Sequence, residues 1–76
     1  MPVDPRQKLP ELLRSLREET GIRQMDLAKR LRKPQSFVSK YESGERRLDV
    51  IELREVCLAL GISLEEFVRR FEDSLG

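Results

Sequence analysis

The sequence predicts an all-α protein, a compact bundle of five helices in a single domain. Apolar residues recur at helical spacing in five segments, and capping side chains or glycines mark the segment boundaries. No segment alternates polar and apolar residues with the period of two that is typical of a strand. With 76 residues there is room for one domain, whose core buries only about 60% of the surface of the unfolded chain.

The first helix is expected from about Leu9 to Thr20. Pro10 suits the first turn of a helix and would break its interior, and Gly21 is expected to end the helix as a C-cap. One apolar stripe runs along it, formed by Leu9, Leu12, Leu13 and Leu16. Residues 1–8 are expected to be a flexible N-terminal arm ahead of a domain that covers residues 9–71.

Two short helices joined by a tight turn are expected next, over about residues 24–31 and 34–42. Proline at the start of the second helix and Ser43-Gly44 at its end mark its limits. The side chains expected to face inward are Leu27, Ala28 and Leu31 in the first and Val38 and Tyr41 in the second. Ala28 is small enough to let the two backbones approach where they cross.

The last two helices are expected over about residues 50–60 and from residue 64 to about Phe71. Each follows a capping-box pattern, Asp49 with Glu52 and Ser63 with Glu66, and Gly61 separates them. The residues expected to be buried are Ile51, Leu53, Val56, Cys57 and Leu60 in the fourth helix and Leu64, Phe67, Val68 and Phe71 in the fifth. Residues 72–76 remain as a short C-terminal tail.

Composition argues against several classes of function. The chain has no histidine, its single cysteine, Cys57, is expected to be a small core residue, and no glycine-rich phosphate loop is present. We therefore expect no enzyme activity, no metal site, no cofactor and no small-molecule ligand. No apolar run approaches the roughly 20 residues of a membrane span, and the first residues do not resemble a signal peptide, so a cytoplasmic location without membrane contact is expected.

Charge is unevenly distributed along the chain, although the net charge is only +1. Residues 23–47 hold eight basic and three acidic side chains, a net charge of +5, while residues 48–76 hold three basic and seven acidic ones, a net charge of −4. A molecule polarised in this way can face a polyanion with its middle segment and point its C-terminal part away. The distribution favours double-stranded DNA as a partner.

The third expected helix carries side chains suited to reading bases. Gln35 and Ser36 fall in its first turn, on the side away from Val38 and Tyr41, and glutamine can pair bidentately with adenine N6 and N7. Ser39 and Lys40 follow one turn later on the same exposed side. The phenyl ring of Phe37 has two alternatives: it packs against the second helix, or it touches a thymine methyl group.

Residues suited to the phosphate backbone surround that helix. They are Gln24 at the start of the second helix, with Arg23, Lys33, Arg46 and Arg47. Any one of them can equally be a plain solvated charge. Phosphate contacts position a DNA-binding protein on the duplex, and base contacts specify its site.

The segments LLRSLREETGIRQMDLAKRL, PQSFVSKYESGERRLDVIELREVCLALGIS and LEEF resemble the lambda-repressor/Cro-like helix-turn-helix family, also called the XRE family. The resemblance spans about Leu12 to Phe71. It implies a five-helix bundle, with the helix-turn-helix formed by helices 2 and 3, and sequence-specific operator binding, commonly by symmetric dimers. It also implies a phosphate contact for Gln24, base contacts for Gln35, Ser36 and Lys40, and a backbone contact near Arg47.

The sequence departs from the family pattern in the turn between helices 2 and 3, where the family usually has glycine and this chain has Arg32. A left-handed arginine there costs roughly 1–2 kcal/mol relative to glycine. Lys33 is also a poor N-cap for the third helix.

The function expected from the sequence is therefore that of a small transcriptional regulator, a repressor that binds a palindromic operator as a homodimer. The dimer surface is expected on the fourth and fifth helices or the C-terminal tail. Its candidate residues recur at i, i+4 and i+8 and are Phe67, Phe71 and Leu75. The alternative for these residues is that the core takes Phe67 and part of Phe71, which leaves only Leu75 over. The alternative is a protein-interaction module, such as an antitoxin or adaptor that grips a basic partner with its acidic C-terminal part. The sequence leaves open the operator, the regulated genes and any partner protein.

Overall fold

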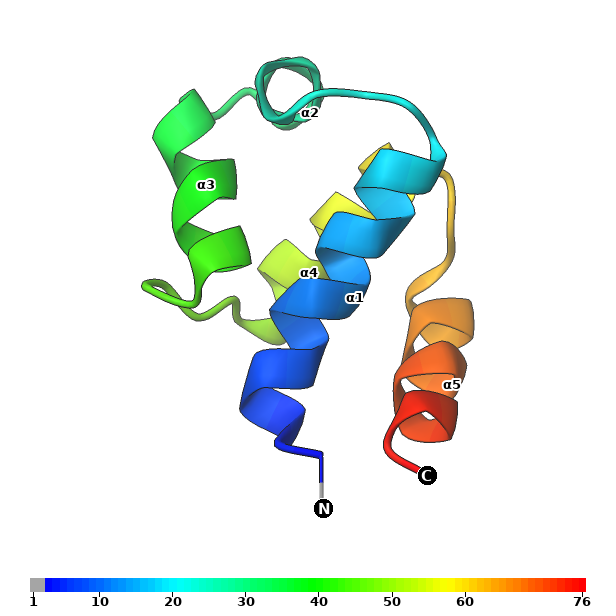
Figure 1. The fold of residues 1–76 in the computed structure, drawn as a ribbon. Helices are drawn as coiled ribbons and strands as arrows, with labels where there is room; N and C mark the ends of the chain where they lie inside the picture. The colour runs from blue at the N-terminus through cyan, green and yellow to red at the C-terminus, as the bar shows by residue number, and fades with distance from the viewer. Residues whose placement is uncertain (1–2) are drawn as a thin grey trace.

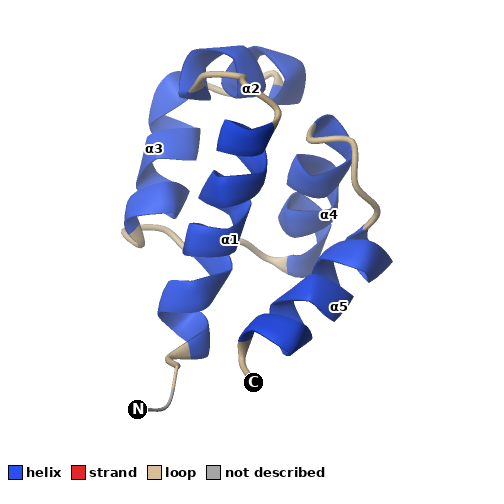
Figure 2. Cartoon of the chain, turned by 45° about the vertical axis from the view of Figure 1, so that its right-hand side comes forward, coloured by secondary structure: helices blue, strands red, loops and turns tan. Residues whose placement is uncertain are grey.

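The computed structural model describes residues 3–76 and confirms an all-α architecture of five helices, with no strand in that range. In chain order the helices are α1 (Pro5–Glu19), α2 (Gln24–Leu31), α3 (Gln35–Ser43), α4 (Val50–Ala59) and α5 (Leu64–Ser74). Helix α1 runs through the middle of the molecule, with α3 and α5 on opposite sides of it (Figures 1 and 2). None of the described helices is long and apolar enough to span a membrane.

Helix α2 is viewed along its axis in Figure 1 while α3 is seen from the side, so the two helices run in clearly different directions. Leu27 and Ala28 on α2 and Val38 and Tyr41 on α3 are all buried, as the sequence predicts. Both helices therefore turn their apolar sides into the same core, and the outer side of α3 remains in solvent.

The core draws side chains from all five helices. Its members are Leu13, Leu16, Leu27, Ala28, Phe37, Val38, Tyr41, Leu53, Val56, Cys57, Leu60 and Phe67. Cys57 is fully buried, and desolvation raises the pKa of its thiol to about 11, which confirms its role as a small core residue.

Two residues expected in the core are exposed. Ile51 is 66% exposed, because on a helix it points about 200° away from Leu53, which faces the core. Val68 is 44% exposed beside the buried Phe67. Phe67 is only 1% exposed, and Phe71 stacks on it with 6.3 Å between ring centroids, so Phe67 takes the core role that the sequence left open as the alternative to a dimer contact.

Helix α1 begins at Pro5, so the expected start at Leu9 is wrong. The Asp4 carboxylate caps the helix by accepting a hydrogen bond from the Arg6 N–H at 2.9 Å, and Pro5 occupies the first turn. Pro10 consequently lies inside the helix, where its ring nitrogen cannot donate to the Arg6 carbonyl. Residues 5–8 of the expected flexible arm are helical, and residues 1–2 lie outside the described range.

The last two helices begin where the sequence predicts. Asp49 accepts from the Glu52 N–H at 2.7 Å, and Glu52 accepts from the Asp49 N–H at 3.0 Å, a complete capping box. Ser63 caps α5 by accepting from the Glu66 N–H at 3.0 Å, while the Glu66 carboxylate pairs with Arg69 and Arg70. Helix α5 continues to Ser74, so the expected tail from residue 72 is mostly helical.

The turn between α2 and α3 depends on a left-handed arginine. Arg32 has φ 57° and ψ 41°, and among the described residues it alone combines a side chain with a positive φ. This conformation lets the Lys33 N–H reach the Ala28 carbonyl at 3.0 Å and redirects the chain into α3. The turn that orients α3 therefore requires an unfavourable backbone conformation at Arg32.

Replacing Arg32 by glycine should raise the free energy of unfolding by about 0.5–1 kcal/mol. Glycine removes the left-handed strain, and its greater freedom in the unfolded chain offsets part of the gain. Urea unfolding of Arg32→Gly measures the change. As a matched control, Arg14→Gly inside α1 should lower the free energy of unfolding by about 1 kcal/mol. If Arg32→Gly also lowered it, the left-handed strain at Arg32 would be contradicted.

Candidate nucleic-acid interface

The outer face of α3 gathers polar side chains that the core does not use. With about 100° between successive residues of a helix, Gln35, Ser36, Ser39 and Lys40 share one side, opposite Phe37, Val38 and Tyr41. Gln35, Ser36 and Lys40 are exposed and make no side-chain hydrogen bond or ion pair within residues 3–76. The structure thus brings the predicted base-reading residues together on one surface.

The serines on this face differ in whether their hydroxyl groups are already hydrogen-bonded to the helix backbone. The Ser39 hydroxyl donates to the Ser36 carbonyl at 3.3 Å and is only half-exposed. Ser43, which the sequence interpretation did not include, lies on the same face, four residues after Ser39 and eight after Gln35. Its hydroxyl donates to the Lys40 carbonyl at 3.0 Å. Helical spacing alone could have identified it.

The start of α3 has no side-chain cap. Pro34 is the N-cap residue itself, one position before its predicted place in the first turn, and it offers no side-chain acceptor. The N–H groups of Gln35 and Ser36 therefore lack helical partners and point out along the positive end of the helix dipole. Such a helix start favours an approaching phosphate.

Phe37 packs inside the protein. Its ring is 9% exposed and meets Tyr41 edge-on, with 5.7 Å between centroids. Two cations lie over the ring, with Lys33 Nζ at 5.6 Å and the Arg46 guanidinium carbon at 4.8 Å from its centroid. Of the two predicted alternatives, the structure has the packed ring, which leaves little of it for a thymine.

Arg46 is held by groups within the chain. Its guanidinium donates two hydrogen bonds to the Glu52 carboxylate, at 3.1 and 2.6 Å, and a third to the Arg47 carbonyl at 3.0 Å. The hydrogen bond to Glu52 raises the pKa of Arg46, and the same bond lowers the pKa of Glu52. Arg46 therefore fastens the α3–α4 loop to the first turn of α4, and its charge is already paired within the chain.

A buried ion pair joins α1 to α3. Arg17 Nε donates to Glu42 Oε2 at 2.7 Å and Arg17 Nη2 to Glu42 Oε1 at 3.1 Å, with side chains only 10% and 3% exposed. The hydrogen bond to Glu42 raises the pKa of Arg17. The sequence interpretation missed this pair, although Arg17 follows Leu13 by four residues and so lies on the inward stripe of α1.

The ion pair also connects α2. Gln24 Nε2 donates to Glu42 Oε1 at 2.9 Å, and Arg17 Nη1 donates to the Ile22 carbonyl just before α2 at 2.9 Å. Gln24 is thereby fixed in orientation at the first position of α2, where its backbone N–H lacks a helical partner. Its amide oxygen and second amide hydrogen remain available.

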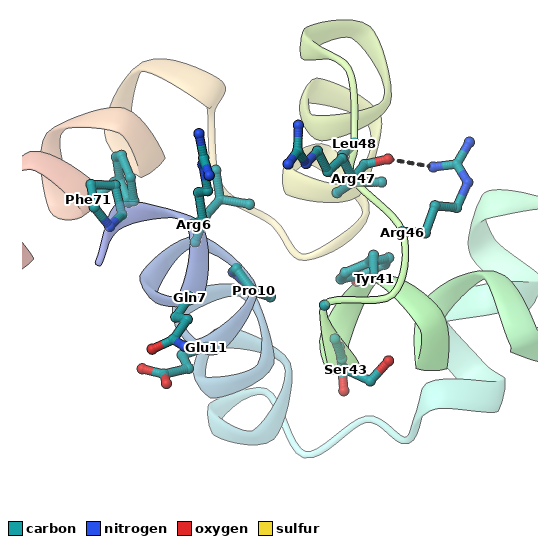
Figure 3. Close-up of a pocket in the computed structure, with 14 residues that line it drawn as sticks. Arg6, Gln7, Pro10, Glu11, Tyr41, Ser43, Arg46, Arg47, Leu48 and Phe71 are labelled. Carbon is teal, nitrogen blue, oxygen red and sulfur yellow. Dashed lines mark hydrogen bonds between the residues drawn. The ribbon is translucent and has the colours of Figure 1, made fainter. Parts of the chain in front are cut away.

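The remaining candidate phosphate contacts are solvent-exposed. Arg23 pairs loosely with Asp26 at 3.3 Å, and its side chain is 78% exposed. Lys33 and Arg47 have no ion pair within the described chain. Arg47 lies beside a hollow of about 700 Å³ between the start of α1, the α3–α4 loop and Phe71 (Figure 3). Arg6, which the sequence interpretation did not single out, lines the same hollow.

Replacing Glu42 by alanine should destabilise the fold by about 3–5 kcal/mol, since it leaves the Arg17 guanidinium buried without its counter-charge. Thermal unfolding followed by circular dichroism measures the loss. Glu45→Ala, three residues on in the exposed loop, is the matched control and should change stability by less than about 0.5 kcal/mol.

The double variant Arg17→Met/Glu42→Leu removes both charges together. It should be less destabilised than Glu42→Ala, because no unpaired charge is left in the interior. Equal losses in Glu42→Ala and Glu45→Ala would show that the buried pair does not stabilise the fold.

Comparisons with known proteins agree with this geometry. A helix-turn-helix family model matches residues 13–67. The structure is similar to that of an XRE-family-like protein from Pseudomonas syringae pv. tomato str. DC3000, with 43% identity over 95% of this chain and 88% of that one and a TM-score of 0.87. No curated protein matches the sequence.

Two further structures are similar over nearly their whole length. The clp gene regulator ClgR from Corynebacterium glutamicum is 28% identical, with 100% of this chain and 97% of that one covered and a TM-score of 0.83. The restriction-modification controller protein C.Esp1396I, solved as a tetramer with its natural 35 base-pair operator, is 22% identical, with 96% of both chains covered and a TM-score of 0.87. At that identity the likeness shows a shared fold.

Proposed function

The chain belongs to the XRE-type helix-turn-helix family, and from that premise we propose that it is a DNA-binding transcriptional regulator whose α3 enters the major groove. The observation that carries the proposal is the outer face of α3. Gln35, Ser36 and Lys40 present free polar groups there, on a helix whose other side is anchored in the core. An α-helix is about 10–12 Å across with its side chains, which fits the major groove of about 12 Å.

Base reading is assigned to the first turn of α3 and the turn after it. Gln35 pairs with an adenine through its amide, Ser36 donates to or accepts from a neighbouring base, and Lys40 reaches guanine O6 and N7 or a phosphate. Ser39 and Ser43 lie on the same face, with hydroxyls that bond back to the helix.

Phosphate contacts are assigned on both sides of α3. Gln24 and the free N–H groups at the start of α2 hold one phosphate, and Arg23, Lys33 and Arg47 neutralise others. Because the Gln24 amide is oriented by Glu42, it needs little reorganisation on binding. Arg46 is not assigned a phosphate contact, since it already forms an ion pair with Glu52.

We propose further that the protein acts as a repressor and binds as a homodimer on a palindromic operator. A single α3 offers only a few base contacts, and a symmetric pair doubles them over half-sites about 34–36 Å apart. The bound pair then blocks the DNA that it covers. ClgR is described as a clp gene regulator and C.Esp1396I as a controller protein that forms a complex with its operator, which supports regulation by DNA binding here.

Selection of bound sequences from a random DNA library, at a stated salt near physiological, tests the function directly. We expect an enriched palindrome with half-site centres about 10 bp apart. If no sequence is enriched at protein concentrations well above those that saturate typical specific sites, the protein is instead an interaction module for another protein.

Gln35→Ala should cost about 1–3 kcal/mol of binding to the preferred site and relax specificity at one base pair, because the bidentate contact to adenine is lost. Competition binding against the four base substitutions at each position measures both effects. An unchanged base preference at every position would show that α3 docks differently.

Arg47→Ala should weaken binding to all sequences alike and reduce the slope of log affinity against log salt by about one unit, because one phosphate contact is lost. Salt titrations on specific and random DNA measure the slope. Arg70→Ala on α5, on the opposite side of the molecule from α3, is the control and should leave the slope unchanged (Figure 1). A loss confined to the specific site would instead indicate a base contact for Arg47.

A further inference from the structure

The hollow beside Arg47 has the size of a small-molecule site. It lies between the start of α1, the α3–α4 loop and Phe71 of α5, and its volume is about 700 Å³ (Figure 3). Sites for small ligands usually have volumes of about 300–1,000 Å³. The residues around it come from three distant parts of the chain, within residues 5–11, within residues 41–48 and at residue 71. Sequence motifs are local, so they give no sign of such a site.

The wall of the hollow is formed in large part by apolar side chains. Leu9, Leu48 and Phe71 line it and are half-buried against the core. Pro10 and the ring of Tyr41 also line it. An apolar ligand that covered these side chains would remove them from water, which favours binding.

Two arginines give the hollow its charge. Arg6 on α1 and Arg47 in the α3–α4 loop both line it and are exposed, and neither side chain makes an ion pair or a hydrogen bond within residues 3–76. The carboxylate of Glu11, which also lines the hollow, lies well away from both guanidinium groups (Figure 3). Guanidinium groups bind carboxylates through paired, charge-assisted hydrogen bonds. The polar group that best complements this part of the hollow is therefore a carboxylate.

Tyr41 carries a buried polar group that has no partner. The residue is 2% exposed, and in the part of the chain that the structure describes its hydroxyl is the one buried side-chain oxygen or nitrogen without a hydrogen bond. Burial raises the pKa of Tyr41, so the hydroxyl stays protonated and can donate. A buried donor without a partner costs free energy, and a polar atom brought beside Tyr41 would offset that cost.

We propose that the hollow binds a small carboxylic acid with an apolar body, and that the bound acid weakens DNA binding. The carboxylate is held by Arg6 and Arg47, and the apolar body covers Leu9, Leu48 and Phe71. The hollow thus gives this small protein a site for a metabolite signal without a second domain.

Arg47 connects the hollow to DNA binding. It is assigned above to a DNA phosphate, and a guanidinium paired with a bound carboxylate no longer neutralises that phosphate. The acid and the DNA therefore oppose each other, and by linkage DNA weakens binding of the acid by the same factor. This regulatory step rests on the proposed function, whereas binding of the acid to the free protein does not.

Binding is tested on the full chain without DNA, by following backbone amide shifts in two-dimensional NMR spectra at constant ionic strength. Naphthoate carries the carboxylate and an apolar body, naphthamide has the same shape without the charge, and acetate has the charge without the body. Naphthoate should bind about tenfold more tightly than either control, with the largest shifts at Leu9, Leu48 and Phe71. Equal binding of naphthamide, or no binding of naphthoate and of the aliphatic octanoate, would overturn the proposal.

Variants of the two arginines locate the carboxylate. Arg6→Gln and Arg47→Gln should each weaken naphthoate binding about fivefold and leave the circular dichroism spectrum unchanged, since both side chains are exposed and unpaired. Lys8→Gln is the matched control, because Lys8 is a cation on the same helix as Arg6 that does not line the hollow. Equal losses in all three variants, or undiminished binding by the double variant Arg6→Gln/Arg47→Gln, would refute the assigned site.

A titration of DNA binding separates this proposal from the proposed function. Naphthoate should weaken binding of the original chain to its selected DNA sequence and reduce the slope of log affinity against log salt by about one unit. Arg47→Gln should no longer respond. If naphthoate binds the free chain and DNA affinity does not change, the regulatory step is wrong. If naphthoate binds a chain that binds no DNA, the proposed function fails and the site stands.

Discussion

The buried pair of Arg17 and Glu42 determines how α3 is held against α1 and the start of α2. Four hydrogen bonds surround it, two between the partners and one each with the Ile22 carbonyl and the Gln24 amide. Two charges taken out of water are costly unless their geometry and remaining hydrogen bonds are good, and here α1, the start of α2 and the end of α3 all contribute. Because the groups are directional, the pair fixes the tilt of α3 in a way that apolar contacts alone would not. The same carboxylate orients the amide that we assign to a phosphate.

A second ion pair, between Arg46 and Glu52, holds the α3–α4 loop in place. Arg46 joins the loop to the capping box of α4 through Glu52 and covers the Phe37 ring at 4.8 Å. The net charge of the middle segment is therefore a poor guide to what a phosphate would meet. Arg46 has its charge matched internally, while Lys33, Lys40 and Arg47 do not. Lys33, Lys40 and Arg47 are exposed on or beside α3, and they would contribute to any surface there that meets a polyanion.

Two locally unfavourable features meet at the turn that precedes α3. Arg32 takes a left-handed conformation, and the first turn of α3 has no side-chain cap. Deviations of this kind are usual at functional sites, where a helix start without a cap keeps its N–H groups available for a ligand. The rest of the fold offsets the cost with side-chain caps on α1, α4 and α5 and with a core shared by all five helices.

The sequence by itself determined the five helices, most of the core and the outer face of α3, because helical periodicity and capping patterns are local properties of the chain. Local patterns failed where two rules competed. Pro10 in a first turn placed the expected start at Leu9, but Asp4 caps the helix and α1 begins four residues earlier, at Pro5. Only the tertiary structure decided which charges are free, since Arg17 meets Glu42 across 25 residues of chain and Arg46 folds back onto Glu52. It also placed Phe67 fully in the core and left Ile51, which the sequence assigned to the core, exposed. Periodicity shows which residues of a helix share a face, and only packing against the other helices decides which face is covered.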